Sequence, residues 1–284
     1  LAMVGSENPG PAGMPSDDLS DGTAGHRGVY LITDAPGVVA GLQALLDVDL
    51  DPVHHADVRR WPLDDPNYAP PDWYAPEDTS GGDLYQVLWP EPLTVTGSFE
   101  FEIISSPENS LSTQFGLLGL VNRAGAGDTL YVQQLQEPPY WGPITGTPAT
   151  DPNVRLEAFI DAARRGAHVR ILLDRHFDEP DTPRSNAATI RYVNRIAQAE
   201  GLDLRAAQGD PTGIGIHNKM VLAQIGGAGY VHVGSINGSE AASKVNREVA
   251  LQVQSNAAYD YLARMFELDW TLSVPAVLLP LVMR

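Results

Sequence analysis

Two short motifs in the last third of the chain combine residue types that suit chemistry on a phosphodiester. His217 and Lys219 are one residue apart at the start of an expected strand, so their side chains project from the same face. An imidazole can attack phosphorus or protonate a leaving oxygen, and an ammonium group neutralises non-bridging oxygens. Ser235 and Asn237 follow Gly234 after a short strand and supply hydrogen bonds that hold phosphate and lysine. The combination predicts a phosphodiester site.

Further residues are candidates for supporting roles. Glu248 can fix the tautomer of an imidazole and support its positive charge, although an ion pair with Arg247 is the alternative. Tyr140 and Trp141, in the loop after an expected strand, are candidate substrate contacts. The adjacent pair at residues 54–55 does not predict a metal site, because neighbouring residues of an extended chain point to opposite faces. We expect no metal.

The segments that position these residues alternate between two patterns. Alternating or continuous apolar runs predict strands at residues 99–104, 130–135 and 169–174. Helical apolar spacing is found at residues 117–123, 154–165 and 187–199. Residues 220–223 and 230–233 are predicted to form a hairpin that ends at Gly234. Strands that alternate with helices predict a layered α/β domain.

An internal repeat relates the two ends of the chain. Residues 1–8 align with 230–237, residues 26–33 with 246–253 and residues 42–50 with 262–270. Both copies contain Gly-Ser-x-Asn, so Ser6 and Asn8 correspond to Ser235 and Asn237. We therefore expect Ser6 and Asn8 to approach the same site and to bind substrate. Gly28 stands where the second copy has Glu248, so carboxylate support in the first copy is lacking or comes from elsewhere.

Four segments follow from these patterns. Residues 1–52 are the C-terminal part of a first repeat, 53–97 a Pro/aromatic-rich connector, 98–274 a complete second repeat and 275–284 an apolar tail. Because nothing in the chain corresponds to what precedes Gly-Ser-x-Asn in the second repeat, we interpret the chain as starting within its first repeat. We expect the aromatic residues of the connector to pack it together: Trp61, Tyr68, Trp73, Tyr74, Tyr85 and Trp89.

Composition excludes several classes of site. The 284 residues include no cysteine, which excludes disulfides, thiolate metal sites and cysteine nucleophiles. The formal net charge is −18 and the only lysines are Lys219 and Lys244, so we expect no binding to duplex nucleic acid. The longest apolar run, residues 274–283, is shorter than the roughly 20 residues of a membrane-spanning helix, so no transmembrane span is expected.

These residues resemble the signature of the phospholipase D superfamily, which is His-x-Lys, four residues, Asp, and then Gly-Ser-x-Asn. His217, Lys219, Gly234, Ser235 and Asn237 match it, and Gln224 stands at the family's aspartate. Segments 104–107, 131–134, 162–166 and 246–248 are also similar to recurring family segments, so the likeness covers most of residues 98–270 and 1–51. It implies a mixed β-sheet flanked by helices and two pseudo-equivalent repeats, of which the first is incomplete here.

The resemblance also implies a mechanism across two facing repeats. One histidine attacks phosphorus to give a phosphohistidine, the other protonates the leaving alcohol, and water or another alcohol completes the exchange without a metal or other cofactor. His217 is one of these two histidines, and the other is expected about a dozen residues before Leu1, by analogy with the spacing from His217 to Gly234. We therefore expect the missing N-terminal half of the protein, or a second copy, to complete the site.

The function implied is that of a phospholipase D-type phosphodiesterase, which hydrolyses a phospholipid to phosphatidic acid and a headgroup alcohol, acting in a secreted or cell-surface protein. Acidity and lysine poverty favour lipid over nucleic acid as the substrate. Two alternatives stay open. A phosphatidyl transferase of the cardiolipin synthase type uses the same intermediate, and a non-catalytic binding or surface module is suggested by Gln224 and Gly28.

Overall fold

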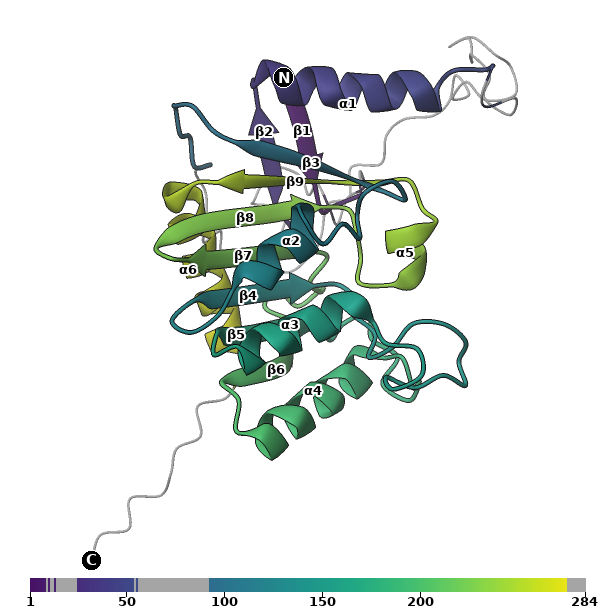
Figure 1. The fold of residues 1–284 in the computed structure, drawn as a ribbon, viewed down its shortest axis with the longest axis vertical. Helices are drawn as coiled ribbons and strands as arrows, with labels where there is room; N and C mark the ends of the chain where they lie inside the picture. Colours follow the sequence, from purple (N-terminus) through teal and green to yellow (C-terminus); the bar gives the residue numbers. More distant parts are fainter. Residues whose placement is uncertain (9, 11–12, 14–24, 54, 56–91, 275–284) are drawn as a thin grey trace, which may run out of the picture.

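A seven-stranded mixed sheet forms the centre of the computed structural model, which describes residues 1–8, 10, 13, 25–53, 55 and 92–274 (Figure 1). Its strands are β3 (Phe101–Ser106), β4 (Thr129–Gln134), β5 (His168–Asp174), β6 (Leu204–Gly209), β7 (Lys219–Ile225), β8 (Ala228–Gly234) and β9 (Glu248–Gln254). The spatial order is β3-β9-β8-β7-β4-β5-β6. The three strands β4, β5 and β6 are parallel, and every other neighbouring pair is antiparallel.

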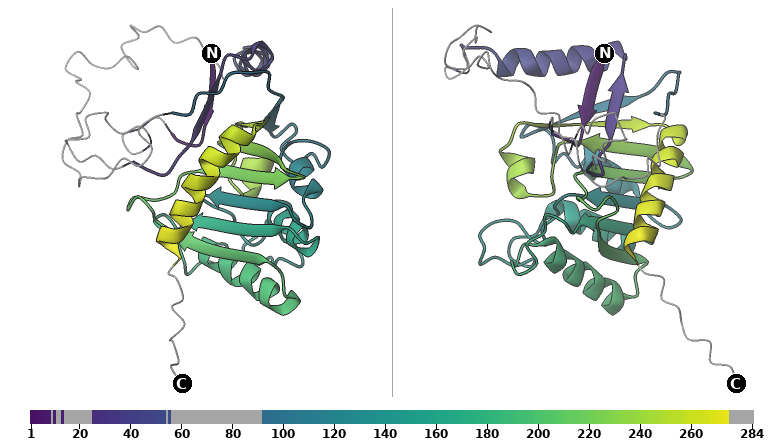
Figure 2. Two further views of the ribbon diagram at one scale, coloured as in Figure 1. Left: turned by 90° about the vertical axis from the view of Figure 1, so that its left-hand side faces the viewer. Right: turned by 180° about the vertical axis from the view of Figure 1, so that it is seen from behind.

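Helices cover both faces of this sheet (Figures 1 and 2). On one face lie α2 (Gly116–Arg123) and α3 (Val154–Arg164), and α4 (Asn186–Glu200) packs beside β6. The helix α6 (Asn256–Ser273) crosses the opposite face, and the short α5 (Glu240–Lys244) precedes β9. Phe159 fills the core under α3, and Phe266 fills the core under α6. The mixed α/β fold predicted from sequence is confirmed.

Local sequence explains where these elements begin and turn. Asn153, Ser185 and Ser255 cap α3, α4 and α6 by accepting hydrogen bonds from backbone N–H groups of the first helical turn. Gly226 and Gly227 both have positive φ, 56° and 83°, which permits the tight turn of the predicted hairpin between β7 and β8. β7 is apolar on both sides because helices cover both faces of the sheet.

The N-terminal segment repeats the last part of the chain in three dimensions. β1 (Ala2–Gly5) pairs antiparallel with β2 (Tyr30–Thr33), and α1 (Pro36–Asp49) follows. Gly5 lies opposite Tyr30 in this pair, as Gly234 lies opposite Ala250 between β8 and β9. The unit β1-β2-α1 therefore has the order and register of β8-β9-α6, which supports the repeat inferred from sequence.

This N-terminal unit packs against the β8–β9 end of the large sheet (Figure 2). Val4 and Val38 form an apolar cluster with Leu251 of β9. Arg27 forms a parallel bridge with Ile216, which precedes β7. The chain therefore brings residues 1–8 and 25–33 to the strand that carries Lys219.

Several sequence predictions fall outside the described residues. They are most of the 53–97 connector with its aromatic residues, most of the 9–25 loop, His54, and the tail at 275–284. Within the described ranges, no helix is long and apolar enough to cross a membrane.

Candidate active site

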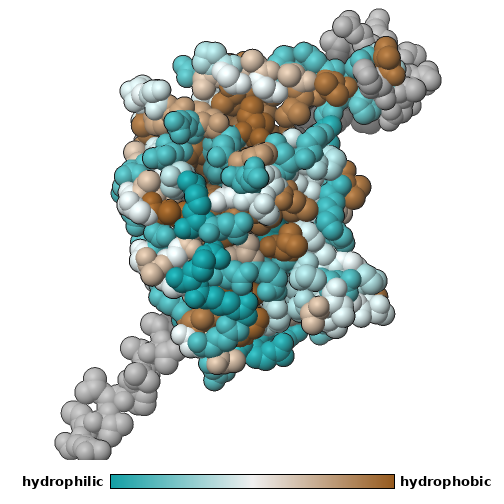
Figure 3. Space-filling model, in the orientation of Figure 1, coloured by the Kyte–Doolittle hydropathy of each residue, from teal (hydrophilic) through white to brown (hydrophobic). Residues whose placement is uncertain are grey.

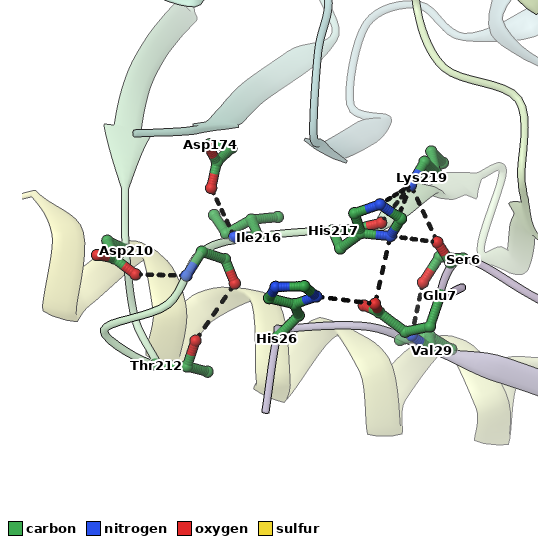
Figure 4. Close-up of polar contacts among 11 residues, drawn as sticks. Ser6, Glu7, His26, Val29, Asp174, Asp210, Thr212, Ile216, His217 and Lys219 are labelled. Atoms are coloured by element: carbon green, nitrogen blue, oxygen red, sulfur yellow. Dashed lines mark hydrogen bonds and ion pairs between the residues drawn. The ribbon is translucent and has the colours of Figure 1, made fainter. Parts of the chain in front are cut away.

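The segment that carries His217 is held in place by two carboxylates, of which Asp174 is buried and Asp210 is partly exposed (Figure 4). Asp174, at the end of β5, accepts hydrogen bonds of 2.6 Å from the backbone N–H groups of Ile216 and Phe177. Asp210 accepts a 2.8 Å hydrogen bond from the N–H of Gly215, whose φ of 106° favours glycine. Burial raises the pKa of Asp174 above its ordinary value. Together these bonds fix the backbone of Gly215 and Ile216, which directly precede His217.

The imidazole of His217 is held through its Nδ1 atom, and its Nε2 atom lies near Lys219. Its Nδ1 lies 2.7 Å from the carbonyl oxygen of Ser6 and 3.3 Å from Oε2 of Glu7. Both of these groups accept hydrogen bonds, which favours the tautomer with its proton on Nδ1 and its lone pair on Nε2, while Nζ of Lys219 lies 2.9 Å from Nδ1 and 3.4 Å from Nε2. The side chain is 15% exposed, so a substrate can reach it. This is the tautomer that an attacking imidazole needs.

Lys219 is almost fully buried beside this ring, with 3% of its surface exposed. Its Nζ donates hydrogen bonds to the carbonyl oxygens of Ser6, at 2.9 Å, and of His217, at 2.7 Å, and lies 2.9 Å from Nδ1 of His217. Burial lowers the pKa of Lys219 to about 8, while the carboxylates of Glu7 and Glu248 oppose this effect. The ammonium form therefore predominates at neutral pH, where it can neutralise phosphate oxygens.

A carboxylate that sequence reasoning missed lies at the centre of the site. The side chain of Glu7 is 2% exposed, and its Oε2 lies 3.3 Å from Nδ1 of His217 and 3.2 Å from Nδ1 of His26. Any side chain at position 28 would clash with the carboxylate of Glu7, so Gly28 leaves the space that this group occupies. Glu7 occupies the variable position of the first Gly-Ser-x-Asn motif. In the sequence, only the glycine at position 28 pointed to a group that needs this space.

The support of an imidazole by Glu248 stays a prediction, and a different carboxylate contacts His217. Glu248 begins β9, and its carboxylate accepts a 3.2 Å hydrogen bond from the amide of Asn246. The carboxylate that contacts the imidazole belongs to Glu7, and Glu248 acts on the site through its charge, which raises the pKa of Lys219. The expected Arg247–Glu248 pair is also not what forms, since Arg247 binds Asp49 and Glu108.

The two serines use their hydroxyl groups in the same way. The hydroxyl of Ser6 accepts a 2.9 Å hydrogen bond from the N–H of Val29, and that of Ser235 accepts one of 3.1 Å from the N–H of Val249. Each hydroxyl group thus joins two neighbouring segments within its own repeat unit. Ser6 reaches the site through its carbonyl oxygen.

The two asparagines differ in their surroundings. Asn8 is exposed, at the end of the first described stretch. Oδ1 of Asn237 is buried and has no hydrogen-bond partner among the described residues, so it can receive a donor from a ligand. The loop at Asn237 is held from below by Arg155, which donates to the carbonyl oxygens of Ile236 and Asn237 at 3.3 and 3.0 Å.

Tyr140 and Trp141 are buried, and their polar atoms bind the protein itself. The hydroxyl of Tyr140 donates to the carbonyl oxygen of Ile144, and the indole N–H of Trp141 donates to that of Gly238 at 2.9 Å. Trp141 therefore positions the residue that follows Asn237. Both rings also line a cavity of about 230 Å³ together with Arg184, so contact with substrate stays a prediction.

Two other residues lie apart from this chemistry. His232 is buried in β8, and burial together with the charge of Arg155 lowers its pKa to about 3. Gln224, at the position of the family's aspartate, is exposed near the end of β7 opposite Lys219. Within the described ranges, no cluster of three or more His, Asp or Glu side chains is arranged to hold a metal ion.

The chain is similar to a known family model and to several solved structures. A family model described as "Cardiolipin synthase, PLD-like domain" matches residues 143–270, whereas no curated protein matches the chain. Among solved structures, the phospholipase D family member Nuc from Salmonella typhimurium is 19% identical, with 62% of this chain and 97% of that chain covered and a TM-score of 0.44. NucT from Helicobacter pylori is 16% identical, with 63% and 100% covered and a TM-score of 0.47.

The family match spans the residues that carry the chemistry. His217, Lys219, Ser235 and Asn237 all lie between residues 143 and 270, on the strands and loops described above. The His-x-Lys and Gly-Ser-x-Asn motifs and the mixed α/β fold agree with the match. Residues 143–270 therefore match a PLD-like domain, which supports membership of the phospholipase D superfamily.

Proposed function

We propose that this protein is a phospholipase D-type phosphodiesterase that hydrolyses a phospholipid through a phosphohistidine on His217. The observation that carries the proposal is the environment of this ring. The carbonyl oxygen of Ser6 lies 2.7 Å from Nδ1, so Nε2 is the nitrogen available for attack, and the Lys219 ammonium lies 3.4 Å from Nε2, where it can receive phosphate oxygens.

The reaction has two steps at phosphorus. In the first, the lone pair of Nε2 of His217 forms a bond to phosphorus and the bond from phosphorus to the headgroup oxygen breaks, with a proton passing to that oxygen. In the second, water attacks phosphorus, the phosphorus–nitrogen bond breaks and its electron pair returns to Nε2. Lys219 stabilises the negative charge on the non-bridging oxygens throughout. The unpartnered amide oxygen of Asn237 accepts a hydrogen bond from the substrate or the incoming water.

Charge and surface favour a phospholipid as the substrate. With a net charge of −18 and two lysines, the chain repels a long polyanion. The strands that lead to the site also expose apolar side chains, since Met3 is 57% and Ile32 is 63% exposed and the two are cross-strand neighbours. Figure 3 shows brown, hydrophobic residues gathered towards this end of the molecule. Such a surface suits a substrate with acyl chains.

Phosphatidyl transfer is the second candidate. The matched family model is described as a cardiolipin synthase, PLD-like domain, and the same phosphohistidine can be resolved by an alcohol in place of water. The two activities are separated by adding glycerol, or phosphatidylglycerol, to the assay and identifying the lipid product.

Trapping the covalent intermediate tests the proposal. The protein is mixed with phosphatidyl-p-nitrophenol, quenched, and searched by peptide mass spectrometry for an adduct on His217. We expect a burst of p-nitrophenol stoichiometric with the protein and an adduct that His217→Ala abolishes. A protein that binds vesicles of this lipid without a burst or an adduct is a binding module, and the proposed function is then wrong.

A further inference from the structure

The site holds a second imidazole, from a residue that neither motif includes. The rings of His26 and His217 are stacked, with centroids 5.4 Å apart and planes inclined by 20°. The Nδ1 atoms of both rings face the same oxygen, Oε2 of Glu7, at 3.2 and 3.3 Å (Figure 4). His26 is 15% exposed, the same fraction as His217, so both rings are accessible to one ligand.

The backbone of residues 25–29 fixes His26 beside His217. The N–H of Arg27 donates to the carbonyl oxygen of Gly215 at 2.9 Å, and the N–H of His217 donates to the carbonyl oxygen of Arg27 at 3.1 Å. The two histidines therefore lie on paired segments, His26 one residue before Arg27 and His217 one residue after Ile216 at the parallel bridge.

Buried polar groups hold this pairing from beneath. The guanidinium group of Arg27 binds both carboxylate oxygens of Asp269 in α6, at 2.7 and 2.9 Å, and Gln133 donates to the same carboxylate at 2.9 Å. Asp269 is fully buried. On its outer side, His26 meets the edge of the Phe177 ring, with centroids 5.3 Å apart. His26 is thus held by its backbone pairing, by Glu7 and by Phe177.

The two rings differ in the charged groups that contact them. One carboxylate, Glu7, faces both rings, so it balances one positive charge and not two. The ammonium group of Lys219 is in contact with the ring of His217, and a proton added to that ring would place two positive charges together. The contact with Lys219 therefore suits His217 to the role of nucleophile, which leaves His26 for the role of proton donor. Cleavage of a phosphodiester through phosphohistidine requires this division between a proton donor and a nucleophile.

We propose that His26 is the general acid of the reaction and that Glu7 is the positioning residue that orients both imidazoles. The inference rests on the proposed function of His217 and deepens it. When the bond from phosphorus to the headgroup oxygen breaks, the proton on Nε2 of His26 passes to that oxygen, and His26 becomes neutral. When water attacks the phosphohistidine, Nε2 of His26 takes a proton from the water, and the bond from phosphorus to His217 breaks.

This assignment differs from the expectation drawn from the sequence, in which the second histidine comes from a missing N-terminal half or a second copy. In the described chain, a second imidazole already lies beside His217, with ring centroids 5.4 Å apart. It comes from the first repeat, at the residue aligned with Asn246 of the second.

Two substrates that differ only in their leaving group separate a proton donor from a structural residue. Phosphatidylcholine releases an alkoxide that must be protonated, whereas phosphatidyl-p-nitrophenol releases a phenolate that departs without a proton. We expect His26→Gln to lower kcat on phosphatidylcholine by about 10² to 10⁴-fold and to leave the p-nitrophenol burst within a few-fold of the native chain. His217→Ala removes both activities.

The matched control is His176→Gln, because His176 meets the same Phe177 ring edge-on, with centroids 4.7 Å apart, on an exposed loop. Its activity on both lipids is expected to equal that of the native chain. Equal activity of His26→Gln and the native chain on phosphatidylcholine would overturn the role of His26, and so would an equal loss on both lipids, which indicates a structural defect. A native chain with no burst on the p-nitrophenyl lipid instead overturns the proposed function.

Discussion

The Nζ of Lys219 donates a 2.9 Å hydrogen bond to the carbonyl oxygen of Ser6, a residue 213 positions earlier in the chain. This bond makes the N-terminal unit part of the site. It also buries the lysine, and burial is the largest cause of its lowered pKa. The electrostatics of the site therefore depend on the docking of residues 1–8.

Activity is expected to fall as the pH rises through about 8. Lys219 must be an ammonium group to neutralise phosphate oxygens, and its pKa is lowered to about 8. Titrating kcat on phosphatidyl-p-nitrophenol from pH 6 to 10 measures this, because that substrate needs no general acid. A rate that stays level to pH 10 would show that Lys219 keeps its proton or is not needed.

The same group predicts the opposite trend for stability. An unfolded lysine holds its proton up to about 10.5, whereas Lys219 in the folded protein releases it near 8. Between these values the unfolded chain binds more protons, so the free energy of unfolding rises with pH. Urea unfolding at pH 7.5 and 10 should show a gain of about 2 kcal/mol in the native chain relative to Lys219→Met. A pH-independent difference between the two proteins would contradict the shift.

Substituting Gly28 by alanine should impair catalysis without unfolding the protein. The added methyl group meets the far end of the Glu7 side chain, which can move, so the cost to the fold is small. The displaced carboxylate no longer orients the two imidazoles, and kcat on phosphatidylcholine should fall by about 10²-fold. Gly37→Ala is the matched control, since a Cβ there meets open space. Unchanged kcat in Gly28→Ala would rule out a role for Glu7 in orienting the rings.

Much of the fold was predictable because it depends on local patterns. The spacing of apolar residues gave α3 and α4 to within one residue at each end, and the hairpin between β7 and β8 followed from its glycines. β6 was not predicted, because its sequence of small residues, with Ala206, Ala207 and Gly209, has little β-propensity. Packing against α4 and pairing with β5 determine its conformation instead.

The site was predictable only where a motif marks it. His217 and Lys219 stand in a recognisable spacing, but Glu7 and His26 act through contacts that join residues about 200 positions apart. No periodicity in the sequence reports such a contact. Trp141 is difficult to predict for another reason, because an aromatic residue in a loop can either line a substrate site or pack inside the protein. In the structure its indole N–H donates a hydrogen bond to the carbonyl oxygen of Gly238.

The buried pair of Glu137 and Arg155 should be essential to stability beneath the Gly-Ser-x-Asn loop. Glu137 is fully buried, 3.4 Å from the guanidinium group of Arg155, and accepts a 2.7 Å hydrogen bond from Asn153. Glu137→Gln keeps an acceptor for Asn153 but leaves Arg155 charged and unpaired, which should cost about 3–5 kcal/mol. In urea unfolding, Glu137→Gln combined with Arg155→Met should be more stable than Glu137→Gln alone. A double variant that is less stable would show that the charge of Arg155 is not the source of the cost.

A substitution of Arg27, which binds Asp269 and is next to His26 in the sequence, tests the placement of His26 without changing His26 itself. Lysine cannot bind both carboxylate oxygens at once, so Arg27→Lys loses one charge-assisted hydrogen bond in the core, at a cost of about 2 kcal/mol. Because the segment at Arg27 also carries His26, turnover of phosphatidylcholine should fall more than the burst with phosphatidyl-p-nitrophenol. Arg164→Lys is the matched control, since Arg164 binds both oxygens of Glu200 in the same way but is 38% exposed, and both activities should be unchanged. An equal loss on both lipids in Arg27→Lys would mean that the pair supports the whole site and does not act specifically on His26.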